Sequence, residues 1–125
     1  MFLFLGQRYI PNISATATWA QNGITLLGGP GGNEKFNRLS GPESFFIDDD
    51  LTMFVSDTHR FRIVGLKPGA TKVYVVAGGH DVGHRKDQLN RPACVIRDKK
   101  TDNLIICERG NTQVVRWPCQ NGISV

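Results

Sequence analysis

Two histidines at a spacing known from zinc sites are the first residues in this chain that suggest chemistry. His80 and His84 are four residues apart, and on a helix this spacing puts two imidazoles on one face, where they can bind zinc. Three glycines surround them, at Gly78, Gly79 and Gly83, and glycine at this density favours a loop. The helical argument therefore fails, and the sequence predicts no zinc site here.

Other patterns that resemble reactive sites are also incomplete. Asp48–Asp50 lacks the alternating oxygen ligands, the glycine and the closing glutamate of a calcium-binding loop. Gly28–Gly32 is rich in glycine but precedes neither a Lys-Ser pair nor a helical pattern, as a phosphate-binding loop requires. No serine lies in a nucleophile-elbow motif. The sequence predicts a non-catalytic protein without a metal or cofactor.

The three cysteines give no metal-binding signature. No two of them show the two-residue spacing of a zinc knuckle, and three thiols leave one unpaired in any intramolecular disulfide scheme. Cys94 begins an apolar run and Cys107 ends one. With Cys119, they are predicted to be small, buried, apolar side chains.

The elements that position these residues follow from composition. The 125 residues suit one domain in the usual range of roughly 100 to 200 residues. The 14 glycines and 6 prolines favour frequent turns and short strands. The formal net charge is +4, and the longest basic run is Lys99–Lys100, which is far short of a dedicated nucleic-acid-binding arm. An all-β fold is predicted.

The N-terminal segment predicts no targeting signal. Met1–Leu5 is apolar, but the run stops at Gly6 and has no basic start, so neither a signal peptide nor a membrane span is expected. Asn12-Ile13-Ser14 permits N-glycosylation if the chain is secreted. The compartment stays open.

An internal repeat is the main signal in the sequence. Leu39 and Leu89 are 50 residues apart, as are Pro42 and Pro92. After each proline come short apolar runs separated by Gly, Asp and Asn turns, and the offset becomes 51 by Asp57 and Glu108. Four runs of about five residues in a period of 50 predict a four-stranded antiparallel blade of a β-propeller.

The repeated residues resemble the NHL-repeat β-propeller family. That family has a Leu-x-x-Pro entry, two strands that each end in Asp, and a short loop before Arg-Ile. The matching positions in this chain are Leu39, Pro42, Asp48, Asp57, Arg62, Leu89, Pro92, Asp98, Glu108 and Asn111. The resemblance covers roughly residues 16–125. Three departures are Arg60 in place of the usual Asn, Glu108 in place of Asp, and Gln113 in place of Arg.

The resemblance implies an incomplete propeller. Residues 1–15 are interpreted as a degenerate N-terminal segment and residues 16–36 as the outer strands of one blade. Residues 37–86 form a complete blade, and 87–125 a second blade that is truncated in its outer strand. The signature residues are interpreted as structural: Asp57 and Arg62 form a charge pair that fixes a hairpin.

Strand alternation puts the loops with the basic excess at one end of the blades. The connections between second and third strands, and between successive blades, share that end. Long loops on a rigid scaffold often carry recognition, and an acidic protein segment or a single-stranded nucleic acid suits a basic surface. The candidate binding residues are His59, Arg60, His80, His84, Arg85, Lys86 and Arg109.

The function that follows is a non-catalytic NHL-repeat scaffold whose loops bind protein. One alternative is an RNA-binding propeller face, because some tripartite-motif proteins use an NHL domain in this way. Another is the recognition part of a larger enzyme, such as an E3 ubiquitin ligase or a metal-dependent lyase with channel histidines. Closed propellers usually need at least four blades. Further blades or another chain are therefore expected to complete the ring, and the isolated chain is expected to expose apolar blade faces and to associate or fold poorly.

Overall fold

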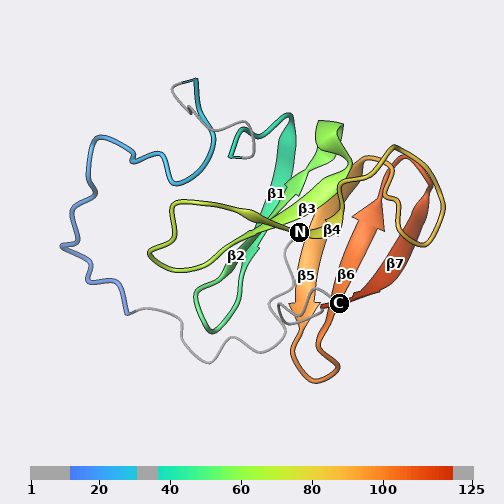
Figure 1. Ribbon diagram of the computed structural model, residues 1–125. Coiled ribbons are helices and arrows are strands. Elements are labelled where there is room, and N and C mark those ends of the chain that lie inside the picture. The colour runs from blue at the N-terminus through green and yellow to red at the C-terminus, as the bar shows by residue number, and fades with distance from the viewer. Residues whose placement is uncertain (1–11, 31–36, 120–125) are drawn as a thin grey trace.

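The computed structural model describes residues 12–30 and 37–119 and shows an all-β protein with two antiparallel sheets (Figure 1). Sheet A has the strand order β1–β2–β3–β4 and sheet B the order β5–β6–β7. A short 3-10 turn, η1 (Thr58–Arg60), joins β2 to β3. The strands are β1 (Pro42–Ile47), β2 (Met53–Asp57), β3 (Arg62–Leu66), β4 (Tyr74–Gly78), β5 (Pro92–Asp98), β6 (Asn103–Glu108) and β7 (Gln113–Pro118). The predicted all-β class is confirmed.

The first three strands of sheet A and the three strands of sheet B follow the same antiparallel order. Sheet A falls within residues 37–86 and sheet B within 87–125. The first strand of each sheet begins at the repeated proline, and the register shifts just after it, between Pro42 and Phe45 and between Pro92 and Cys94. Proline has no N–H to donate to the ladder, so the first residue of a strand, beside a bulge, suits it. The two sheets therefore share a strand start at proline and a register shift after it, at positions 50 residues apart.

The outer strands expected at residues 16–36 are not formed in the part of that range that the structure describes, residues 16–30. Trp19 and Ile24 there are 76% and 87% exposed. A two-stranded ribbon is marginally stable without a third strand or a packed face, and in Figure 1 this segment (blue) lies on the far side of sheet A from sheet B. Residues 1–11, 31–36 and 120–125 lie outside the described residues, so the N-terminal part of the expected degenerate segment and the end of the expected truncated blade fall there.

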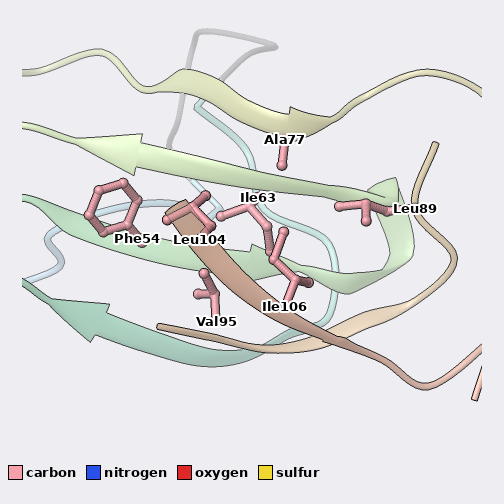
Figure 2. Close-up of a cluster of buried hydrophobic side chains, with 7 residues drawn as sticks. All are labelled: Phe54, Ile63, Ala77, Leu89, Val95, Leu104 and Ile106. Atoms are coloured by element: carbon pink, nitrogen blue, oxygen red, sulfur yellow. The ribbon is translucent and has the colours of Figure 1, made fainter. Parts of the chain in front are cut away.

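The core lies between the two sheets. Figure 2 shows its side chains converging from both sheets and from the loop that joins them. Trp117 of β7 packs against this cluster. The fully or nearly fully buried members are Phe54, Ile63, Ala77, Leu89, Val95, Leu104 and Ile106. Because strand side chains alternate, each sheet has a core face and an opposite face, which we call its outer face.

The outer face of sheet B is where the predicted burial of side chains fails. It consists of Cys94, Ile96, Ile105, Cys107, Val114 and Arg116, as the register places them. Cys94 and Cys107 are exposed, and Cys119 is half-buried. The prediction that these cysteines are buried is therefore wrong for Cys94 and Cys107. Their apolar neighbours occupy both faces of each strand, whereas only one face meets another sheet.

Candidate protein-binding surface

A buried carboxylate holds the turn at the end of β2. Asp57 is 0% exposed. Its Oδ1 accepts the backbone N–H of Ser40 at 2.6 Å, and its Oδ2 accepts Nε of Arg62 at 2.7 Å. Arg62 also donates from Nη2 to the carbonyl of Arg38 at 3.2 Å. The loop before β1, the end of β2 and the start of β3 are thus held by one carboxylate and its charged partner. We call this cluster the Asp57 clamp.

Sheet B has the same arrangement without the ion pair. Glu108 is 1% exposed. Its Oε1 accepts the backbone N–H of Asn90 at 2.8 Å and Nδ2 of Asn111 at 3.0 Å, and its Oε2 accepts Nε2 of Gln113 at 2.7 Å. Asn111 also donates to the carbonyl of Gly83 at 2.9 Å. In this cluster, which we call the Glu108 clamp, the neutral amides of Asn111 and Gln113 donate to the carboxylate, as the Arg62 guanidinium does in sheet A.

Most of the remaining motif residues are buried or make hydrogen bonds within the chain. Leu89 is 1% exposed in the core, and Pro92 is buried at the start of β5. Leu39 is half-buried and Pro42 exposed. Asp98 accepts the hydroxyl of Thr101 at 2.6 Å, and this bond lowers the pKa of the carboxyl group. The structural interpretation fits these contacts, since each carboxylate binds nearby backbone or side-chain donors.

Polar contacts join the two sheets at both ends. At the end that carries the basic loops, Thr58 Oγ1 donates to the carbonyl of Pro92 at 2.7 Å. At the opposite end, Arg97 donates to Asp48 at 2.6 Å and to Asp102 at 2.9 Å. The bond to Asp102, together with that to Asp48, raises the pKa of Arg97 further above its already high value. Hydrogen bonds at both ends therefore fix the position of the two sheets relative to each other, in addition to the packing of the core between them.

The candidate binding residues lie on three connections at the predicted end. His59 and Arg60 are in η1, and Arg109 begins the turn between β6 and β7. A side chain at Gly41 would meet His59 Nδ1 at 2.6 Å, so the imidazole lies directly against the backbone before β1. His80, His84, Arg85 and Lys86 are all exposed in the long loop before β5.

Several of these cations have partners within the chain. Arg60 donates to the carbonyl of Arg38 at 2.6 Å. Arg85 pairs with Asp87 at 3.2 Å, and Arg109 pairs with Glu43 at 2.6 Å. Exposed pairs of this kind contribute little to stability, but they neutralise part of the charge that a nucleic acid would need.

An apolar surface lies on the outer face of sheet B. Val114 is 65% exposed and Ile96 45%. They flank Ile105, which is half-buried, and the exposed pair Cys94 and Cys107. Across the sheet, Cys94, Cys107 and Val114 stand side by side, as do Ile96, Ile105 and Arg116. Contiguous apolar area on a sheet face is typical of an interaction surface.

A cleft of about 1580 Å³ opens between the sheets beside β4 and β7. Tyr74 and Trp117 line it, together with Arg97, Lys86 and Cys119. Arg97 already binds two carboxylates, and burial raises the pKa of Tyr74 and of the Cys119 thiol.

No protein-family model matches this chain, and no curated protein matches it significantly. Within the described residues, no three His, Cys, Asp or Glu side chains come together as a metal site would require. No helix in the same residues is both long enough and apolar enough to cross a membrane.

Sequence reasoning did not find two features of these surfaces. Arg97 occupies the repeat position of Ile47, so nothing in the repeat indicates that it bridges Asp48 and Asp102. The sequence predicts exposed apolar blade faces, but it does not identify the face at Cys94, Ile96 and Val114 as the open one. These residues alternate with Val95 and Val115, which separates the two faces of each strand but does not say which face is open.

Proposed function

We propose that this chain is a non-catalytic, protein-binding scaffold of NHL-type propeller blades, and that the outer face of sheet B binds a further sheet of the same kind. One observation carries the proposal. The outer face of sheet B is the repeat counterpart of the face of sheet A that packs against sheet B. The position of the binding surface therefore follows from an interface that the chain already makes.

The counterpart positions can be followed residue by residue. Phe54 and Ile63 belong to the core face of sheet A and are 1% and 0% exposed. Their counterparts, 51 residues later, are Ile105 and Val114 on the outer face of sheet B. Ser44 and Ser56 of sheet A correspond to Cys94 and Cys107. Burying such a face would remove several exposed apolar side chains from water, each worth roughly 1.5–3 kcal/mol when fully buried.

The chain also carries the complementary face. Phe45 and Val55 on the outer face of sheet A are the repeat counterparts of Val95 and Ile106, which sheet B buries against sheet A. Phe45 is 63% exposed and its strand neighbour Ile47 46%, whereas Val55 is already buried at 5% exposure, so the open part of this face lies on β1. The occupant that we assign is therefore a second copy, which stacks the outer face of its sheet A on the outer face of sheet B. Such a contact is heterologous and can close into a ring.

Protein binding is favoured over RNA binding because arginines of the basic loops already pair with carboxylates of the same chain. Arg85 and Arg109 already pair with carboxylates, whereas the outer face of sheet B lies against no described element that buries it. The fully buried core of a protein interface, and homodimer interfaces in general, are more apolar than the rest of the surface. Single-stranded nucleic acids instead need a charged groove with stacking aromatic rings.

Sedimentation equilibrium tests the proposal. The wild-type chain should associate with increasing concentration, and Ile96→Lys/Val114→Lys should weaken association at least about tenfold, equivalent to about 1.4 kcal/mol. The matched control is Leu51→Lys/Val82→Lys, which adds the same charge at two exposed apolar residues outside this face. A wild-type chain that stays monomeric, or a face variant that associates like the control, would contradict the proposal.

A further inference from the structure

Two thiols stand opposite each other on the outer face of sheet B. Cys94 of β5 and Cys107 of β6 are direct partners in the antiparallel ladder. Residues directly opposite in such a ladder have Cα atoms about 4.5–5.5 Å apart and Cβ atoms at a similar distance. Both side chains lie on the same face, and both residues are exposed.

This arrangement fits a disulfide with only a small adjustment. Disulfides join residues whose Cα atoms are roughly 4.4–6.8 Å apart and whose Cβ atoms are about 3.5–4.5 Å apart. The Cα separation of a ladder pair is within that range, and the Cβ atoms need to approach slightly. The register shift between Pro92 and Cys94 lies next to the pair. β5 is also the edge strand of sheet B, so a small movement breaks no ladder on its other side.

We infer that Cys94 and Cys107 form a reversible dithiol–disulfide pair, a modification site on the outer face of sheet B. The oxidant is a small-molecule disulfide such as glutathione disulfide. A thiolate of one cysteine attacks it, forms a mixed disulfide and releases one glutathione thiolate. The second cysteine thiolate then attacks the protein sulfur of the mixed disulfide and releases the second glutathione. Two protein thiols are oxidised, and one glutathione disulfide is reduced to two glutathione molecules.

The pair differs from the third cysteine in its surroundings. Cys119 is half-buried in the cleft beside Trp117, and burial raises the pKa of its thiol. It lies beyond the end of β7, whereas the two paired cysteines lie within facing strands. Exposed thiols are the ones that exchange readily, and exposed disulfides are the labile ones. The oxidation should therefore be selective for the Cys94–Cys107 pair.

Thiol counting and peptide mapping test this inference. The chain is incubated with glutathione disulfide at a concentration where sedimentation shows monomer, and free thiols are then counted. Two of the three thiols should be lost, with the mass falling by two hydrogens. Trypsin cuts after Arg97, Lys99 and Lys100, which separate the cysteines. A linked peptide pair containing Cys94 and Cys107 should therefore appear, and dithiothreitol should separate it.

Variants sharpen the result. Cys119→Ser should still lose two thiols, whereas Cys94→Ser and Cys107→Ser should each gain one glutathione at the remaining partner. Wild-type mapping needs no variant, so a folding defect in one of them leaves the test intact. Retention of both thiols in the monomer, or a link to Cys119 instead, would overturn the inference. Because the assay uses monomer, its outcome is independent of association, and the stacking proposal fails or stands separately.

Discussion

Sheets A and B are both antiparallel and share features about 50 residues apart, but their surroundings differ. Each ends its second strand with a buried carboxylate that accepts a backbone N–H from the preceding loop, Asp57 with Ser40 and Glu108 with Asn90. Sheet A has a fourth strand, and its core face is covered by sheet B. Sheet B has three strands in the described residues. Its outer face, which carries the counterparts of the core-face residues of sheet A, is open. The shared carboxylates fix the turns in both sheets. The sheets differ in which of their faces another sheet covers.

The clamps show the same difference on a smaller scale. In sheet A the carboxylate binds a guanidinium that is itself only 9% exposed. In sheet B it binds amide donors from Asn111 and Gln113. The hydrogen-bonding pattern is kept while the charge of the partner changes. The energetic cost of losing the carboxylate should therefore differ between the two sheets.

The largest effect is expected at the Asp57 clamp. Asp57→Asn removes the charge opposite buried Arg62, and breaking a buried pair in this way costs about 3–5 kcal/mol of unfolding free energy. Glu108→Gln leaves no buried cation and should cost about 1–3 kcal/mol, the range for an unsatisfied buried hydrogen-bonding group. Urea unfolding followed by circular dichroism measures both. Equal losses would remove the distinction between the clamps.

The two faces of sheet B provide the next comparison. Leu104→Ala deletes a side chain that is 0% exposed in the core and should lower the free energy of unfolding by about 2–5 kcal/mol. Ile105→Ala, the next residue but on the outer face, should change the monomer by less than about 1 kcal/mol while weakening association. The same urea experiment at low protein concentration checks the first effect, and sedimentation checks the second. A large monomer destabilisation by Ile105→Ala would mean that this face is covered within the chain itself.

Moderate to small effects are expected at Thr58 and Arg109, two residues 51 positions apart that each join the two sheets. Thr58 is 0% exposed, so Thr58→Val leaves the carbonyl of Pro92 without this donor, at a cost of about 1–3 kcal/mol. Its counterpart Arg109 makes a largely exposed pair with Glu43, and Arg109→Ala should cost about 0.2–1 kcal/mol. Thermal melts of the two variants and wild type rank them. A reversed ranking would show that the Arg109–Glu43 pair contributes more to the stability of the chain than its exposure indicates.

Much of the fold could be predicted from the sequence because turn residues recur at a fixed period. Pro42 and Pro92 mark the start of equivalent strands, and Asp57 and Glu108 mark the end of equivalent hairpins. Local physics explains this: proline suits a strand start, and a carboxylate binds the donors of the turn beside it. η1 after Asp57 was not predicted, nor was the irregular path of residues 16–30.

The covered or open state of a face could not be predicted from the same pattern. Cys94, Val95 and Ile96 are consecutive apolar residues, so alternation gives the two faces of β5 without saying which one meets sheet A. The contacts of Arg97 with Asp48 and Asp102 also depend on how the two sheets are placed. Both features are set by packing between repeats, and local sequence carries little information about that.

Photo-crosslinking from the outer face of sheet B tests the stacking proposal most directly. A benzophenone amino acid at position 114, where Val114 is 65% exposed, is introduced into the chain, which is mixed with isotope-labelled copies and irradiated. Stacking of sheet A of one copy on sheet B of another predicts crosslinks to labelled peptides from β1 and β2, around Phe45 and Met53. Crosslinks to β5–β7 of the labelled copy, or no crosslinks between copies, would contradict the account.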